Sequence, residues 1–225
     1  RGGPPPRSPP HPRSSFAGSG PEFHPRAPRE RYSRPKTLRT GYIGTGVIAE
    51  KQMARLKEAN GPGVTVTTAT DIHDGRLQAW GKRHGVTRLY HDWREMLAKE
   101  DIDAVAVCTP NNVHCDPTVD SLRAGKHVLL EKPMSITSAE GEKMVAEAKK
   151  ADRLLMMAFQ HRFSAEAQML RRYVQDGAFG DILYVRAQAL RRRGIPSWGE
   201  FGLKDVQGGG SLIDIGVHVM EMSHY

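Results

Sequence analysis

The feature that most limits the fold of this chain is a glycine-rich turn between a short apolar strand and a helix. The strand is expected over Leu38–Ile43, and the turn reads Gly44-Thr45-Gly46-Val47-Ile48-Ala49. Gly44 allows a tight turn, Gly46 lets backbone approach a pyrophosphate, and Ala49 permits close packing of the helix on the strand. The N–H groups at the start of the helix favour phosphate charge. The predicted dinucleotide-binding residues are therefore Gly44, Thr45, Gly46, Val47 and Ile48, and the alternative is a glycine turn that binds no nucleotide.

Strands and helices alternate from residue 38 to residue 159. The expected strands are 38–43, 64–70, 104–108, 127–130 and 154–159, and the expected helices are 48–59, 75–84, 92–99, 116–124 and 138–151. Ala104–Cys108 is continuously apolar, as is typical of a parallel strand that is covered on both faces. This alternation predicts an α/β fold, a Rossmann-type doubly wound parallel sheet that binds its ligand at the carboxyl ends of the strands.

The pattern changes after residue 159. An amphipathic helix over Ala165–Gln175 is followed by an alternating segment, Ile182–Leu190, that predicts a half-exposed strand. An irregular loop over 194–207 and the triplet Gly208–Gly210 lead into a last helix over Leu212–Tyr225. We therefore expect a nucleotide-binding domain over 37–159 and the incomplete start of a second, α+β domain with an open sheet over 160–225.

Residues 1–36 form a proline- and arginine-rich tail. Most of the net charge of +8 comes from this tail and the few residues after it, so the remainder of the chain is nearly neutral. Because the tail has almost no aliphatic residues, we expect it to be disordered. Because the remainder is nearly neutral, no nucleic-acid partner is expected, and binding of nucleic acid through the tail is the alternative. The chain starts with Arg1 and its first methionine is Met53, so we interpret it as a fragment, or as a chain whose start lies upstream.

Composition also limits the cellular setting. No run approaches the roughly 18 apolar residues of a membrane span, so no membrane partner is expected. Cys108 and Cys115 form neither a CxxC pair nor a set of metal ligands, which favours reduced thiols in a cytoplasmic protein without a metal.

Asp71 ends the second expected strand, 22 residues after Ala49. A carboxylate at this position accepts hydrogen bonds from the adenosine ribose hydroxyls and disfavours a 2′-phosphate, which indicates NAD rather than NADP. Arg76 lies close enough in sequence to leave NADP open.

Polar residues follow the strand that ends at Cys108. Thr109, Asn111 and His114 are expected to meet the cofactor, because strand carboxyl ends line the ligand crevice of such a sheet. The alternative is a simple turn in which Asn111 caps the following helix.

Three further residues have the chemistry of a dehydrogenase. Pro133 restricts the backbone of Lys132, whose ammonium group can stabilise negative charge on a reacting oxygen. Asp214 and His218 are four residues apart, on one face of the expected last helix. An imidazole can accept a hydroxyl proton at neutral pH. The alternatives are an ordinary solvated lysine and a surface Asp–His pair.

The combined motifs resemble the Gfo/Idh/MocA oxidoreductases, the group of glucose-fructose oxidoreductase and inositol dehydrogenase. The resemblance covers residues 38–225 and rests on these segments together: Gly44–Ala49, 103–111 with His114, 125–128, Glu131-Lys132-Pro133, Gly208–Gly210 and 214–218. It implies a catalytic set of Lys132, Asp214 and His218, with His218 as proton acceptor. The same three residues are then expected to bind substrate. It also implies cofactor contacts from Glu131, Lys132 and Arg162.

Two departures from this family are visible. Members carry an asparagine before the arginine that follows the sixth strand, whereas this chain reads Gln160-His161-Arg162. Members also continue for about another hundred residues. The chain therefore resembles a family member that is truncated within its second domain. In the loop over 191–202, Trp198 is a candidate to stack on a sugar ring, and a solvated basic loop is the alternative.

The leading hypothesis is an enzyme that transfers a hydride between a secondary alcohol of a sugar, polyol or related carbohydrate and NAD, with NADP possible. Two alternatives stay open: a glycoside-cleaving enzyme of the same family that uses NAD as a transient hydride store, and a non-catalytic NAD(P)-binding regulatory protein. The resemblance also implies that a full-length form is a homo-oligomer.

Overall fold

The computed structural model describes residues 37–59, 63–190, 192–194 and 202–225 of the 225-residue chain. Within them, six strands form one sheet in the order β3-β2-β1-β4-β5-β6, and all neighbouring pairs are parallel. The strands are β1 Leu38–Ile43, β2 Val64–Thr70, β3 Arg88–Tyr90, β4 Ala104–Val107, β5 His127–Leu130 and β6 Leu155–Met157. The predicted Rossmann-type α/β fold is confirmed.

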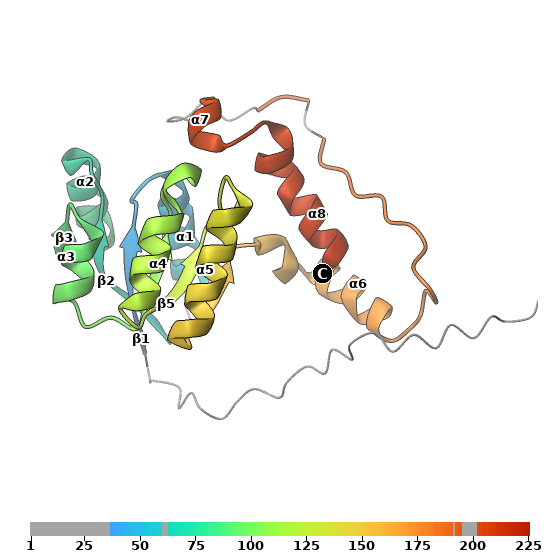
Figure 1. The fold of residues 1–225 in the computed structure, drawn as a ribbon, viewed down its shortest axis with the longest axis horizontal. Coiled ribbons are helices and arrows are strands. Elements are labelled where there is room, and N and C mark those ends of the chain that lie inside the picture. The colour runs from blue at the N-terminus through green and yellow to red at the C-terminus, as the bar shows by residue number, and fades with distance from the viewer. Residues whose placement is uncertain (1–36, 60–62, 191, 195–201) are drawn as a thin grey trace, which may run out of the picture. The chain divides into compact units, whose positions relative to one another are not determined.

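Helices cover both faces of this sheet. They are α1 Val47–Ala59, α2 Asp74–His84, α3 Trp93–Lys99, α4 Cys115–Arg123 and α5 Ser138–Ala151. In Figure 1, α4 and α5 lie in front of the sheet and α1 lies behind it. Neighbouring β1 side chains enter different cores: Ile43 packs in the cluster that includes Met96 and Met144, and Tyr42 packs in the cluster that includes Trp80. This two-sided burial explains the continuously apolar β4.

The edges of the sheet differ from expectation. The short strand β3 was not predicted, because three residues that begin with an exposed arginine show no strand periodicity. The prediction of a buried strand over 154–159 was wrong in length and in burial. β6 pairs only with β5, and Leu154 and Met156 are 59% and 48% exposed. The element is therefore a short edge strand.

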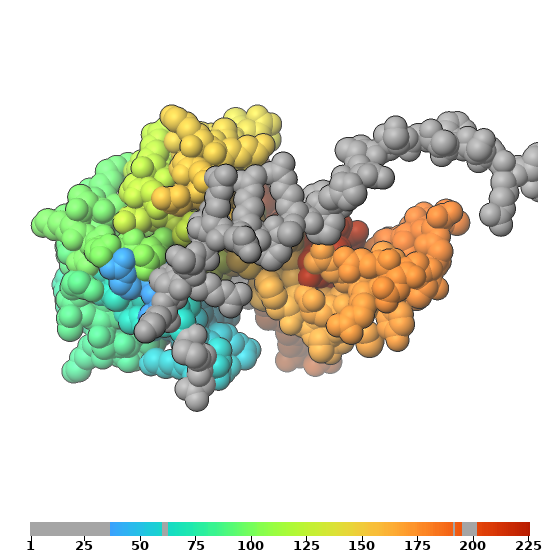
Figure 2. Space-filling model, turned by 90° about the horizontal axis from the view of Figure 1, so that it is seen from below, coloured from blue at the N-terminus to red at the C-terminus, as the bar shows by residue number. Residues whose placement is uncertain are grey.

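The second part of the chain is mainly helical where it is described. It contains α6 Ala165–Gln175, α7 Lys204–Gln207 and α8 Val217–His224, with a π-helical turn over Leu212–Gly216 directly before α8. The predicted strand over Ile182–Leu190 was wrong: this segment has no regular structure and its side chains are exposed. Figure 2 shows it, in orange, at the molecular surface. A strand needs a neighbouring strand to bond its backbone, and none of the described residues supplies one.

Parts of the chain lie outside the described residues. They include the predicted disordered tail, 1–36, and the segment 195–201 with Trp198. In the described part, no helix is long and apolar enough to cross a membrane.

Candidate active site

The glycine-rich turn joins β1 to α1 at the carboxyl edge of the sheet. Gly44 has a φ of +90°, and a Cβ atom there would lie 2.7 Å from the main-chain oxygen of Cys108. A Cβ atom added at Gly46 would meet nothing within 4 Å. Gly44 is thus required by the protein's own packing, whereas the space beside Gly46 can admit a ligand. Val47 and Ile48 follow in the first turn of α1, where backbone N–H groups lack helical acceptors.

Asp71 ties this turn to the end of β2. Its Oδ2 accepts hydrogen bonds from the N–H and hydroxyl of Thr45, at 2.9 and 2.8 Å. Arg76 donates to both carboxylate oxygens, and the N–H of His73 donates to Oδ1 at 2.9 Å. Burial opposes ionisation, but these donors outweigh it and lower the pKa of Asp71 to about 2. Asp71 is therefore an ionised anchor of the turn, and its contact with a ribose stays a prediction.

The loop after β4 contacts the second part of the chain. The Thr109 hydroxyl donates to the Val113 carbonyl at 3.4 Å. The Asn111 side-chain N–H₂ donates to the main-chain oxygen of Gln207 at 3.1 Å and to its Oε1 at 2.8 Å. The alternative that Asn111 caps the next helix is wrong, because His114 is the N-cap residue of α4 and no side chain caps it.

His114 connects two strand-end loops from a buried position. Its Nδ1 lies 2.8 Å from the carbonyl of Pro133, and its Nε2 lies 3.0 Å from the carbonyl of Thr109. Burial lowers the pKa of His114, although the two carbonyls act in the opposite direction. Since both ring nitrogens contact backbone oxygens, the structure gives this side chain a positioning role, and its direct contact with a cofactor stays a prediction.

Glu131 begins the loop after β5. Gln52 of α1 donates to its Oε1 at 2.6 Å, and the N–H of Lys132 contacts its Oε2 at 3.3 Å. Burial raises the pKa of Glu131, against the lowering effect of these donors. The Gln52–Glu131 contact therefore links the helix of the glycine-rich turn to the loop that carries Lys132.

Lys132 and Asp214 meet across 82 residues of sequence. The Lys132 Nζ donates to Asp214 Oδ1 at 2.8 Å and to the Asp214 main-chain oxygen at 3.0 Å. The two side chains are only 19% and 22% exposed. Asp214 lies in the π-helical turn, and not in the regular helix that was expected. π-Helical turns inside helices are frequent at functional sites.

His218 lies in the first turn of α8. Its ring contacts His161 edge-on, at 5.0 Å between ring centroids and 88° between planes, and lies 6.2 Å from the ring of Phe159. Of the predicted catalytic set, Lys132 and Asp214 thus touch directly, and His218 follows one turn later among aromatic rings.

Arg162 is placed against α8. Its Nε forms an ion pair with Glu221, and its guanidinium lies 5.5 Å from the ring centroid of Phe159 and 5.2 Å from that of Tyr225. These contacts hold α8 against the segment after β6. They do not involve the nucleotide-binding turn, and the cofactor contact of Arg162 stays a prediction.

The comparisons with known proteins match both parts of the chain. The model described as "Oxidoreductase family, NAD-binding Rossmann fold" matches residues 38–159, more than half of the chain. The chain belongs to the GFO/IDH/MocA oxidoreductase family. The GFO/IDH/MocA C-terminal domain model matches residues 167–225.

Named members of the GFO/IDH/MocA family are similar over most of this chain. It is 37% identical to the D-glucoside 3-dehydrogenase of Escherichia coli (strain K12) and 29% identical to the myo-inositol 2-dehydrogenase of Thermotoga maritima. Each match covers 84% of this chain, and 53% and 54% of those relatives. The chain therefore spans about half the length of the curated relatives it matches.

A solved structure that is similar to this chain contains NADH. The WlbA dehydrogenase from Bordetella pertussis, in complex with NADH and UDP-GlcNAcA, has a TM-score of 0.61 and 27% identity. The match covers 64% of this chain and 41% of that chain.

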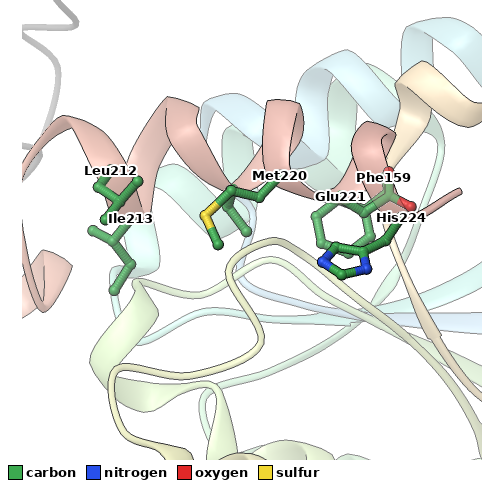
Figure 3. A pocket seen from close by; sticks show the side chains of 7 residues that line it. Phe159, Leu212, Ile213, Met220, Glu221 and His224 are labelled. Carbon is green, nitrogen blue, oxygen red and sulfur yellow. The ribbon is translucent and has the colours of Figure 1, made fainter. Parts of the chain in front are cut away.

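An apolar groove of about 430 Å³ runs along α8 beside this site. Figure 3 shows its lining, which is Phe159, Leu212, Ile213, Val217, Met220, Glu221 and His224. The groove thus shares the segment 212–224 with Asp214 and His218, but other residues of that segment line it. Within the described ranges, no three His, Cys, Asp or Glu side chains are arranged to hold a metal ion.

Sequence reasoning did not assign Gln52, His161 or Gln207 to the site. His161 lies in the triplet that departs from the GFO/IDH/MocA pattern, which was a usable signal. Gln52 and Gln207 carry no local signal, because their partners are 79 and 96 residues away.

Proposed function

We propose that this protein is an NAD(P)-dependent dehydrogenase that oxidises a secondary alcohol of a sugar or polyol. The observation that carries the proposal is the double hydrogen bond from Lys132 to Asp214. It joins the strand-end loop of a nucleotide-binding sheet to the helix of His218. This combination places an ammonium group, a carboxylate and an imidazole on neighbouring elements at the cofactor edge of the sheet.

The residues of the glycine-rich turn fit a dinucleotide. Gly46 leaves open space beside the start of α1, and that helix start presents backbone N–H groups suited to a pyrophosphate. Residues 44–48 would hold the phosphates, with Asp71 near the adenosine ribose. Asn111 and Glu131 would lie nearer the reacting end. When bound, the cofactor would supply the acceptor for the hydride of the carbinol carbon.

The side chains then supply proton transfer and charge stabilisation. As the C–H bond gives up its hydride, His218 takes the hydroxyl proton, and the product is a ketone. Lys132 hydrogen-bonds the reacting oxygen and stabilises the negative charge that develops there. Asp214 holds the Lys132 ammonium group in place and offers a second acceptor for a substrate hydroxyl.

The names of two similar proteins support a carbohydrate substrate. The named relatives are dehydrogenases of a D-glucoside and of myo-inositol. We therefore propose ring hydroxyls of glucosides and inositols as the first substrate class to test. The division into a nucleotide-binding domain over 37–159 and a substrate domain that starts at 160 belongs to the same proposal.

We further propose a cytoplasmic location and a homo-oligomeric longer form. The observation that supports the location is that Cys108 and Cys115 are both free thiols. The oligomeric form is supported by the family resemblance alone.

The deciding experiment measures NADH formation by the purified protein with a panel of glucosides and inositols. We expect turnover with at least one member of the panel, and its loss in His218→Asn. Glycoside cleavage without net NADH formation would replace the dehydrogenase by the glycoside-cleaving alternative. Absence of both reactions, together with intact NADH binding, would favour the regulatory alternative.

A further inference from the structure

The segment 203–216 is attached to the sheet by a second side-chain contact besides Lys132–Asp214. Asn111, in the loop after β4, binds Gln207 at the end of α7 through two hydrogen bonds of 2.8 and 3.1 Å. Both attachments start from strand-end loops at the cofactor edge, one after β4 and one after β5. The Asn111–Gln207 contact has no place in the catalytic scheme above, so its role needs an explanation.

The backbone around Gln207 is held on its other side as well. Gly208 ends α7 with a φ of +79°, and its N–H donates to the Lys204 carbonyl at 2.7 Å. A Cβ atom at Gly208 would lie 2.4 Å from Cγ2 of Ile136, four residues after Lys132. The chain after Gln207 is therefore packed directly on the loop that follows Lys132, and Gln207 has little freedom to move away from Asn111.

The chemistry of the contact determines which end of the Asn111 amide faces outward. The main-chain oxygen of Gln207 can only accept a hydrogen bond, so the N–H₂ group of Asn111 must face it. The nitrogen of that group lies within hydrogen-bond distance of two oxygens of Gln207. The atom left to Asn111 for another partner is its carbonyl Oδ1, which is an acceptor. The cofactor offers matching donors in its ribose hydroxyls.

We propose that Gln207 is a positioning residue that orients the Asn111 amide for the cofactor and holds segment 203–216 on the β4 loop. The inference rests on the proposed function, because it needs a nucleotide at this edge of the sheet. It implies that an acceptor at position 207 is required for tight cofactor binding. The same contact keeps the π-helical turn of Asp214 close to Lys132.

Three variants separate the chemistry of the contact. Gln207→Ala removes the side-chain acceptor, Gln207→Glu keeps an acceptor of similar length, and Asn111→Asp removes both donors. Lys204→Ala, at the other end of the same short helix, is the matched control, because the Lys204 side chain is exposed. Thermal unfolding of each variant checks that the protein is folded.

The first measurement is the dissociation constant for NADH, by fluorescence titration. Loss of one hydrogen bond of about 1 kcal/mol weakens binding roughly fivefold, so we expect that loss for Gln207→Ala and a larger one for Asn111→Asp. We expect Gln207→Glu and Lys204→Ala to stay within about twofold of the parent. Equal weakening by Gln207→Ala and Gln207→Glu would overturn the acceptor role, and parent-like binding by Gln207→Ala would overturn the proposal.

The second measurement needs no cofactor. Hydrogen exchange of the amides of 203–216 is expected to be faster in Gln207→Ala and Asn111→Asp than in the parent or Lys204→Ala. Unchanged exchange would overturn the proposed attachment. If the parent binds no NADH, the proposed function fails, whereas the exchange experiment still decides whether Gln207 holds the segment.

Discussion

The ammonium group of Lys132 donates to two oxygens of one residue, the carboxylate and the main-chain carbonyl of Asp214, at 2.8 and 3.0 Å. One bond depends on the side chain of Asp214 and the other on the backbone of the π-helical turn. The position of the ammonium group is therefore linked to the local helix geometry as well as to a charge pair.

Replacement of Lys132 by methionine is expected to lower kcat by at least about 100-fold, because charge on the reacting oxygen loses its stabilising partner. NADH affinity should fall much less, by no more than about tenfold, because Lys132 supplies only one of the predicted cofactor contacts and the glycine-rich turn is unchanged. Steady-state kinetics and a fluorescence titration measure the two quantities. Lys99→Met, on the exposed face of α3, is the control, and parent-like turnover by Lys132→Met would contradict the mechanism.

Substitution of the two turn glycines is expected to affect different properties: Gly44→Ala the stability of the fold, and Gly46→Ala the binding of NADH. Gly44→Ala should lower the free energy of unfolding by about 1–3 kcal/mol, because its positive φ and the nearby Cys108 carbonyl leave no room for a Cβ atom. Gly46→Ala should leave stability unchanged and weaken NADH binding at least tenfold, or about 1.4 kcal/mol. Urea unfolding and NADH titration on both variants test this; tight NADH binding by Gly46→Ala would place the pyrophosphate elsewhere.

Asp71 should make stability depend on pH in the acid range. Its pKa of about 2 in the folded protein is lower than in the unfolded chain, so the ionised carboxylate stabilises the fold above about pH 4. That contribution, about 2 kcal/mol, is lost as the pH falls from about 4 towards 2. The unfolding free energies of the parent and Asp71→Asn should therefore differ at pH 7 and converge near pH 2. A difference that does not change with pH would contradict the ionised anchor.

His114 is expected to act through the loops it joins. His114→Leu removes the ring that contacts the carbonyls of Thr109 and Pro133, and the carbonyl that accepts the imidazole N–H then lacks this partner, which should cost about 1–3 kcal/mol of stability. Because Pro133 follows Lys132, we also expect a lower kcat with saturating cofactor. Urea unfolding and kinetics measure these effects, with His127→Leu, at the start of β5, as a comparison. Full turnover in a destabilised His114→Leu would restrict His114 to folding.

The sheet could be predicted because its information is local. A parallel strand covered on both faces is apolar throughout, and Gly85 ends α2 with a φ of +72°, a backbone conformation that favours glycine. Strand β3 was missed, and β6 was predicted as too long and too buried, because three-residue strands carry too little pattern. The segment Ile182–Leu190 shows the opposite error: alternating side chains indicate a strand, but a strand also needs a partner.

The residue types of the candidate site could be proposed from the motifs, whereas most of their contacts could not. The Lys132–Asp214 contact agrees with the chemistry inferred from the motifs. Burial of the His114 ring and the contacts of Gln52 and Gln207 depend on residues that meet only after folding. The π-helical turn could not be predicted either, because the spacing of four residues between Asp214 and His218 is typical of one turn of an ordinary α-helix.

The attachment of segment 203–216 by a few polar side chains has a consequence for inactivation. Gly44 and Lys132 follow β1 and β5, which pack in the buried core of the sheet, whereas α7 and its neighbours are largely exposed. Detachment of the segment would separate Asp214 from Lys132 and leave the sheet folded. Heating or mild denaturant should therefore abolish turnover before the circular dichroism of the sheet changes. Cofactor binding through the glycine-rich turn should also persist after turnover has been lost.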